Sequence, residues 1–384
     1  MRWDFLVLGA TGIQGRIVSR DLLENGYSVL LCGRDKLRIK HLLKRYDKTG
    51  FKYVELSNIE NTGRIIKESG ASVVVNCAEG DWNLNVLKSC LKTNVDSLDL
   101  GSDIGMTKKQ FALNSALKRK NLIHVTGCGS IPGVCNVMLR YATEKFDKIS
   151  EIDVGFDWNA NIKKFVVPFS IQSIIEEFTS PAIIFKHGRF VKIRPLDSVT
   201  YCYCRSIGKQ KCFNESNHPE CYTFHHYFEH MGLKDVKTYA GFPKYSFDKI
   251  MDMIELGLGS RKEINFNGIK IRPIDLLTEV LKQISFPEGY KETENLWVHI
   301  NGKKGGASKY IKMECIVPTL KGWDDAGCNV DTGMPASIIA QMIKNKVISN
   351  SGSYAPEAIV PPKEFFEELS KRNMVVLENG KRIN

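Results

Sequence analysis

The first third of the chain alternates short apolar runs with stretches of helical period. Six runs of strand length, rich in Val, Leu and Ile, are expected over residues 4–8, 28–32, 52–56, 72–76, 97–100 and 122–126. Helix-sized stretches separate them, near 13–24, 36–46, 59–68, 84–91 and 108–120. The strands are apolar along most of their length, which is typical of a parallel sheet covered on both faces. The pattern therefore predicts a Rossmann-type, doubly wound α/β domain over residues 1–130.

The pattern changes after a turn-rich junction at residues 126–133, which holds three glycines and one proline. The later strand-like runs, over 149–156, 198–205, 295–300 and 309–317, are longer and more alternating. They indicate a mixed or antiparallel sheet. Since 384 residues exceed what one core usually serves, we expect a second, α+β domain for substrate and dimer contact over 131–330. Residues 331–384 are expected to return to the Rossmann domain.

Composition excludes several classes of protein. The hydrophobic content of 43% is that of a globular protein, and no apolar run approaches the roughly 20 residues of a membrane-spanning helix. The chain runs at once into a strand, without a secretory signal, and its 11 cysteines include no Cys-x-x-Cys pair, so we expect a cytoplasmic protein. The net charge of +11 is dispersed, which predicts an anionic cofactor or substrate rather than a nucleic-acid partner.

A glycine-rich turn, Gly9-Ala10-Thr11-Gly12-Ile13-Gln14-Gly15, joins the first strand to the first helix. Such a turn lets the backbone approach a pyrophosphate closely and points free helix amides at it. At this position in the first βαβ unit it predicts a dinucleotide site. We expect Gly9, Thr11, Gly12 and Ile13 to contact the cofactor.

The end of the second strand bears on the choice of cofactor. NAD enzymes usually place a carboxylate there for the adenosine ribose, but this chain has Gly33-Arg34. A guanidinium suits a 2′-phosphate, so NADP is favoured. NAD stays possible, because Asp35 either caps the next helix or serves a ribose. At the carboxyl edge of the fourth strand, further cofactor contacts are expected from Asn76, Cys77 and Ala78.

Further motifs are spread over nearly the whole chain. They are Leu98-Asp99-Leu100-Gly101, Gly127-x-Gly-x-x-Pro132-Gly133-x-x-Asn136, Glu176-Glu177-Phe178-x-x-Pro181-Ala182, Tyr239-x-Gly241 leading to Glu255-Leu256-Gly257-Leu258, Thr332-Gly333-x-Pro335-Ala336-Ser337-Ile338-x-Ala340, and Pro356-Glu357-Ala358. Together with the glycine-rich turn, in this order and spacing, they resemble the saccharopine dehydrogenase family. The compact length and the Gly-Cys-Gly junction resemble its lysine 6-dehydrogenase-like branch.

The resemblance implies an NAD(P)-dependent homodimer that transfers hydride at a C–N bond of an amino acid, saccharopine- or lysine-like, through an imine. It also implies a substrate pocket between the domains, lined by the junction loop and the loop after the fifth strand. Substrate contacts are therefore expected from Ser102, Asp103, Pro132, Gly133 and Asn136. Asp103 is the candidate catalytic residue, with a loop or cap carboxylate as the alternative. Asn136 and the amides near Gly133 would bind a substrate carboxylate.

Three positions depart from saccharopine reductase, which has Asp, Tyr and Arg where this chain has Ile131, Ser102 and Thr238. Without these groups a dicarboxylic amino acid loses its charge partners, which argues against saccharopine itself. The departures also motivate an alternative function, a non-catalytic NADP-binding sensor or assembly protein. A reductase of C–O or C=C bonds is a third hypothesis, disfavoured because no Tyr-x-x-x-Lys pair follows the fifth strand.

Cysteines and histidines gather between Cys202 and His226. Their Cys-x-Cys-x7-Cys spacing matches no common structural zinc site. Cys202 and Cys204 would share one face of a strand as small core residues. We therefore predict no metal.

Overall fold

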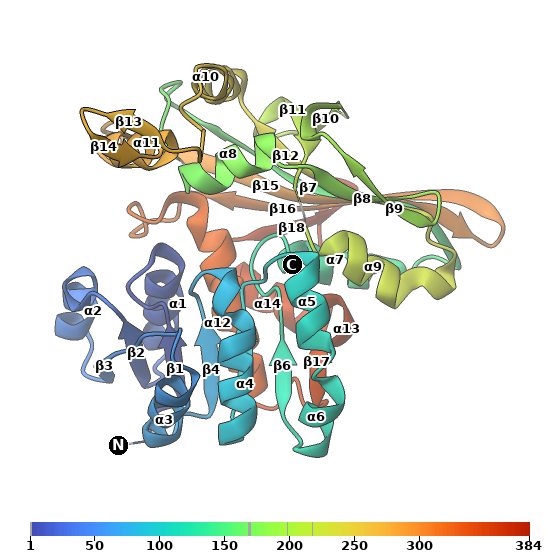
Figure 1. Ribbon diagram of the computed structural model, residues 1–384. Helices are drawn as coiled ribbons and strands as arrows, with labels where there is room; N and C mark the ends of the chain where they lie inside the picture. Colours follow the sequence, from blue (N-terminus) through green and yellow to red (C-terminus); the bar gives the residue numbers. More distant parts are fainter. Residues whose placement is uncertain (1, 168–169, 198, 217) are drawn as a thin grey trace.

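The computed structural model describes residues 2–167, 170–197, 199–216 and 218–384. A parallel sheet with helices on its faces lies below a long mixed sheet in the view of Figure 1. The parallel sheet has the strand order β17-β6-β5-β4-β1-β2-β3. Its strands are β1 (Phe5–Leu8), β2 (Val29–Gly33), β3 (Thr49–Tyr53), β4 (Val73–Asn76), β5 (Asp96–Asp99), β6 (Ile123–Val125) and β17 (Gly352–Tyr354). The predicted Rossmann-type sheet is confirmed.

The third strand lies three residues earlier than predicted, at Thr49–Tyr53 rather than 52–56. The prediction followed the apolar residues Val54 and Leu56, which are buried but lie beyond the end of the strand. The strand itself is at the sheet edge and only half-buried. Its Gly50 leaves room for the Trp3 ring, which would lie 2.8 Å from a Cβ at that position.

Helices cover both faces of the parallel sheet (Figure 1). They are α1 (Ile13–Glu24), α2 (Lys40–Arg45), α3 (Ile59–Ser69), α4 (Asn83–Thr93), α5 (Ile104–Phe111), α6 (Asn114–Arg119), α7 (Val134–Thr143), α12 (Val330–Lys344), α13 (Pro356–Ile359) and α14 (Pro362–Lys371). Helix α12 packs closely on α1, because a Cβ at Gly333 would lie 2.5 Å from the Ile17 side chain. No helix in the described part of the chain combines the length and the apolarity needed to cross a membrane.

The second sheet has the order β10-β11-β12-β7-β15-β16-β18-β19, with β8 branching from β12 and β9 from β8. Its strands are β7 (Lys148–Ala160), β8 (Ala182–Lys186), β9 (Arg189–Ile193), β10 (Val199–Cys204), β11 (Gly208–Asn214), β12 (Asp235–Phe242), β15 (Glu292–Lys304), β16 (Ala307–Pro318), β18 (Val375–Glu378) and β19 (Lys381–Arg382). Because β7 runs parallel to β12 and antiparallel to β15, the predicted mixed sheet is confirmed. Ser198, where one predicted strand begins, lies outside the described residues.

The remaining elements lie along the mixed sheet. They are α8 (Ile171–Thr179), α9 (Glu220–Phe228), α10 (Lys244–Glu255), α11 (Pro273–Leu281) and the hairpin β13 (Ile264–Phe266) and β14 (Ile269–Ile271). The C-terminal segment contributes to both sheets, since β17 pairs with β6 whereas β18 pairs with β16.

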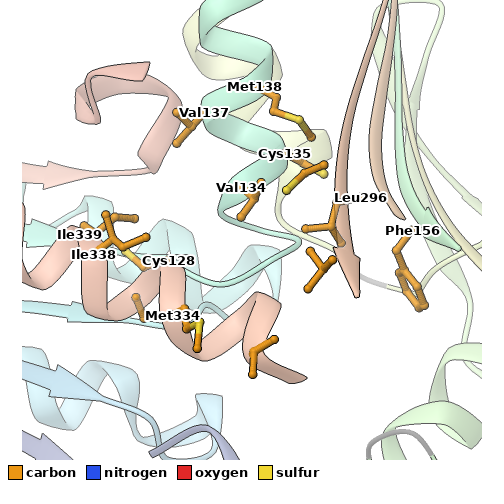
Figure 2. Close-up of a cluster of buried hydrophobic side chains, with 14 of the residues drawn as sticks. Cys128, Val134, Cys135, Val137, Met138, Phe156, Leu296, Met334, Ile338 and Ile339 are labelled. Atoms are coloured by element: carbon orange, nitrogen blue, oxygen red, sulfur yellow. The ribbon is translucent and has the colours of Figure 1, made fainter. Parts of the chain in front are cut away.

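Helix α7 joins the two sheets through one buried core (Figure 2). Its Cys135 and Met138 lie toward Leu296 of β15, while Ile338 of α12 lies on the other side of the helix. All four side chains are at most 1% exposed. This packing holds the carboxyl edge of the parallel sheet against the mixed sheet, and the cavities described next lie along that edge.

Candidate active site

The glycine-rich turn is closed by backbone contacts that admit no side chain. Gly9 has a φ of +71°, and a Cβ there would lie 2.7 Å from the backbone nitrogen of Ala78. A Cβ at Gly15 would lie 2.2 Å from the carbonyl oxygen of Gly9. No side chain caps the N-terminus of α1 at Gly12, and its first turn holds no acidic residue. The turn therefore fits a pyrophosphate, whose oxygens would complete the hydrogen bonding of these amides.

Arg34 follows β2 and is exposed. Two further arginines, Arg16 and Arg38, lie in the same region and were missed by the sequence reasoning. Arg16 of α1 is half-buried and donates to the Thr11 carbonyl at 3.3 Å; burial lowers its pKa, and the positive charge of Arg38 lowers it further. Asp35 accepts a hydrogen bond from Leu37 N at 2.9 Å as a helix cap, which was one of its two predicted roles. The guanidinium groups of Arg34, Arg16 and Arg38 suit a 2′-phosphate.

The residues after β4 form the wall against which the turn packs. Asn76 is buried; its amide donates to Asn83 Oδ1 at 2.8 Å and accepts from Ala78 N at 3.2 Å, so its side chain shapes the turn. Cys77 N donates to Leu8 O at 2.9 Å. Burial raises the pKa of the Cys77 thiol far above its usual range, which disfavours a thiolate there.

A cavity of about 630 Å³, here called the outer cavity, opens at the ends of β4 and β5. The junction loop and α8 form its other walls. The predicted residues Ser102, Asp103 and Pro132 line it. Asp103 Oδ1 also accepts a hydrogen bond from Met106 N at 2.7 Å and so caps α5. Asp103 thus faces the cavity with part of its carboxylate committed to the helix cap.

The structure does not bring Gly133 and Asn136 to a cavity. Asn136 is fully buried; its Oδ1 accepts from Gly133 N at 2.8 Å, and its Nδ2 donates to Glu357 Oε2 at 2.8 Å. The next amide, Val134 N, donates to Gly129 O at 3.0 Å. The expected carboxylate site at the start of α7 therefore lacks a free donor.

A second cavity of about 230 Å³, here called the inner cavity, lies beside the first. Gln14, Ser130 and Thr332 line it from the first sheet's side, and Phe156 and Trp158 from the mixed sheet. Five carboxyl groups and one histidine also line it. They are Glu177, Glu215, Glu292, Glu294, Asp331 and His218.

Sequence reasoning gave none of these acids a role, although Glu177 lay within a quoted motif. They come from four separate segments that only the fold brings together. Ile131, Glu177 and His218 line both cavities, so they form the passage between them.

Burial dominates the electrostatics of the inner cavity. It raises the pKa of Glu215 and of Asp331 to about 7, and those of Glu177 and Glu294 well above their usual range. After burial, the neighbouring Asp331 carboxyl group is the next cause that raises the pKa of Glu294, so the pair favours holding a proton.

His218 lies 3.5 Å from Glu215 and 3.3 Å from Glu220. Burial opposes its charge, but these two carboxylates raise its pKa to about 10. The imidazole is therefore a cation at neutral pH.

The Cys/His stretch behaves as packing. Cys202 and Cys212 are buried against Tyr239 and Trp297, and burial raises the pKa of both thiols. Within the described residues, no three His, Cys, Asp or Glu side chains are placed to hold a metal ion.

The fold and the site define a class, an oxidoreductase built on an NADP-binding Rossmann domain. Residues 5–125 match the saccharopine dehydrogenase NADP binding domain, and residues 129–375 match the saccharopine dehydrogenase C-terminal domain. The chain belongs to the saccharopine dehydrogenase family. Both the resemblance noted in the sequence and the preference for NADP are thereby confirmed.

Two relatives span the whole chain. The carboxyaminopropylagmatine dehydrogenase of Synechocystis sp. (strain ATCC 27184 / PCC 6803 / Kazusa) is 24% identical over 96% of both chains. The structure of apo saccharopine dehydrogenase (L-Glu forming) from Saccharomyces cerevisiae superimposes with a TM-score of 0.77, at 11% identity over 100% of both chains. The second likeness shows the fold alone.

Proposed function

We propose that the protein is an NADP-dependent oxidoreductase acting on a C–N bond of an amino acid, through an imine. One observation carries the proposal: the outer cavity opens at the ends of β4 and β5, beside the glycine-rich turn, and a buried carboxyl group, Glu177, lies in its wall. In such sheets the nicotinamide lies at this edge. The relative from Synechocystis, a dehydrogenase of a carboxyaminopropyl amine, supports the same type of bond.

The chemistry needs a hydride carrier and one proton-handling group. NADP, when bound, accepts or supplies the hydride. In oxidation the carbon gives up a hydride and the nitrogen a proton, which leaves a C=N bond; water then adds and the amine departs from the resulting carbonyl. In the reverse direction an amine and a carbonyl condense with loss of water, and the imine takes up a hydride and a proton.

The carboxyl group of Glu177 fits the proton-handling role better than that of Asp103. Its Oε2 is buried without a hydrogen-bond partner, and burial raises its pKa, so this carboxyl group keeps a proton at a higher pH than an exposed one does. Asp103 Oδ1 is engaged in the cap of α5. We therefore assign the proton transfer to Glu177 and keep Asp103 as a contact for a substrate ammonium.

Hydride transfer tests the proposal directly. Purified protein is mixed with NADP or NADPH and with lysine, saccharopine or carboxylated polyamines, and the absorbance of the reduced cofactor is followed in both directions. We expect turnover with at least one of them. NADP binding without turnover on any would favour the sensor or assembly protein that the departures at Ile131 and Ser102 motivate.

A variant tests the role of Glu177. Glu177→Gln should lower turnover by about 100- to 10,000-fold, the usual contribution of general acid–base catalysis, and leave the Kd of NADPH unchanged. The exposed Glu367→Gln is the matched control. Full activity of Glu177→Gln would remove Glu177 from the mechanism.

A further inference from the structure

We propose that the inner cavity binds a positively charged tail of the substrate, an ammonium or guanidinium group a few carbons from the reacting nitrogen. The proposal rests on the proposed function and names its substrate class. The family resemblance and the glycine-rich turn do not assign this cavity any role.

The first argument is charge. Five carboxyl groups and the His218 imidazolium line the cavity, and no lysine or arginine does so among the described residues. Burial raises the pKa values of these acids in the empty cavity, and a bound cation would favour their ionised forms. Glu215 and Asp331 are 1% and 3% exposed, so solvent does little to screen them. A cationic ligand would pair with the carboxylates that form.

The second argument is hydrogen bonding. Glu215 Oε2, Glu177 Oε2 and Gln14 Oε1 are buried without a donor, and no N–H or hydroxyl reaches Asp331 Oδ2. Once ionised, the carboxyl oxygens accept hydrogen bonds, as the Gln14 oxygen does, so a ligand rich in donors would satisfy them. Trp158 Nε1 is in turn a buried donor without a partner in the same cavity wall. An ammonium brings three N–H donors and a guanidinium up to five. Glu292 is different, since it accepts from Cys328 N at 2.6 Å and from Tyr290 Oη at 3.3 Å, so it frames the cavity.

The third argument concerns the kind of cation. The carboxyl groups are not grouped as metal ligands within the described residues. The walls also include Ile131, Phe156 and Trp158, which suit methylene groups and the face-on contact of an organic cation with an aromatic ring. A metal ion would gain nothing from these side chains. An aliphatic chain ending in a charged nitrogen uses both kinds of surface.

The position of the cavity sets the direction of the ligand. Because Ile131, Glu177 and His218 line both cavities, a chain that passes between them places one end near Glu177 and the other among Glu215, Glu294 and Asp331. The reacting nitrogen would lie in the outer cavity and the charged tail in the inner one. A substrate with two charged nitrogens fits both ends.

Two amines of equal chain length test the proposal. Protein saturated with NADP is titrated calorimetrically with 1,4-diaminobutane and with butylamine, which lacks the second ammonium. We expect the diamine to bind at least ten-fold more tightly. Asp331→Asn and Glu294→Gln should each abolish that difference, whereas Glu367→Gln should keep it, and all four proteins should still bind NADP.

Equal affinities for the two amines, or a diamine preference that survives both replacements, would overturn the proposal. Retained NADP binding shows that a variant is folded, and if Asp331→Asn loses NADP binding, Glu294→Gln decides. The proposed function fails separately. If hydride transfer is equally fast with substrates whose tail is uncharged, the proposed function stands and the tail site is ruled out. If the diamine binds selectively but no substrate is turned over, the tail site stands and the proposed function is ruled out.

Discussion

Arg34 is the residue on which the preference for NADP depends most directly. Its guanidinium is exposed at the end of β2, where a 2′-phosphate would lie. A hydrogen bond to a charged group is worth about 1.5 to 3 kcal/mol, so Arg34→Ala should weaken NADPH binding about 10- to 100-fold. NADH, which lacks the phosphate, should lose less than about two-fold. Fluorescence titration of both cofactors measures the difference.

Arg119→Ala is the matched control, since Arg119 is an exposed arginine of α6, outside both cavities. An equal loss of NADH and NADPH affinity in Arg34→Ala would show that the guanidinium does not select the phosphate. In that case Arg16 and Arg38, the neighbouring cations, would be the residues to replace next.

The Glu294–Asp331 pair makes a prediction about pH. Burial raises the pKa of both carboxyl groups in the folded chain, so between the unfolded value of 4.5 for Glu294 and its folded pKa the native state holds a proton that the unfolded chain has released. The free energy of unfolding therefore falls as pH rises through this window. In Glu294→Gln the side-chain amide can still donate a hydrogen bond to Asp331, but it carries no proton that titrates in this pH range.

We expect the ligand-free Glu294→Gln variant to match wild type near pH 5 and to exceed its stability by about 1 to 3 kcal/mol near pH 8. Urea unfolding at the two pH values measures this. A variant that gains nothing at pH 8 would mean that Glu294 carries no excess proton.

Sequence reasoning found the glycine-rich turn and gave no role to the acids of the inner cavity. Gly9 and Gly12 follow a strand in the local sequence, and that is enough to place a nucleotide turn. Glu215, Glu294 and Asp331 carry no local signal, because they lie in three separate segments that only the fold brings together. Asn136 shows the opposite error, since a polar side chain one turn into a helix is used for a buried bond to Glu357.

At the scale of elements, the β1–α1 turn depends on how closely its backbone packs. Gly9→Ala adds a Cβ 2.7 Å from Ala78 N at a φ of +71°, so it should abolish measurable NADPH binding. Gly26→Ala is the matched control, because its φ is +85° but nothing lies within 4 Å of the added Cβ. It should cost about 1 to 2 kcal/mol of stability and leave the Kd unchanged. Calorimetry and urea unfolding of the pair separate crowding from strain.

A buried ion pair ties three helices together. Arg372, after α14, donates to both oxygens of Asp21 in α1, at 2.8 and 2.9 Å, and Ser337 of α12 donates to the same carboxylate at 2.6 Å. Arg372 and Asp21 are 7% and 5% exposed. Removing Arg372 leaves the Asp21 carboxylate buried without its partner, so Arg372→Ala should lower the free energy of unfolding by about 3 to 5 kcal/mol.

The surface pair of Arg64 and Glu68, 63% and 49% exposed, is the control, and Arg64→Ala should cost less than about 1 kcal/mol. The double variant Asp21→Asn/Arg372→Met should recover much of the loss of Arg372→Ala, because no unpaired charge remains. Additive losses would mean that the pair is not energetically coupled.

Element prediction succeeded where both faces of a strand are buried. The strands β1, β2 and β4 are buried at every position and were placed within a residue or so. The mixed sheet was harder, because the burial of strands such as β8, β11 and β12 follows no regular alternation along their short spans. Strand β17 shows a further limit, since its three residues become a strand only by pairing with β6.

At the scale of the whole molecule, charge is distributed unevenly. The chain carries a net charge of +11, yet the inner cavity gathers five carboxyl groups next to Gln14, which lies in the glycine-rich turn. A bound dinucleotide would add its own negative charges at the start of α1. The cofactor and the cavity acids then repel each other, and a cation in the cavity relieves that repulsion. NADP and a cationic amine should therefore bind with positive coupling.

The coupling must be reciprocal, because it is a free energy shared by two sites. Saturating NADP should tighten 1,4-diaminobutane about 5- to 150-fold, and saturating diamine should tighten NADP by the same factor. Calorimetric titrations in both orders measure the two factors. Asp331→Asn and Glu294→Gln should reduce both factors together, since each removes a carboxyl group with which the amine would pair. If NADP and the diamine bind independently in the wild-type protein, the cavity acids do not sense the cofactor, and the inner cavity and the nucleotide turn would have to be treated as separate sites.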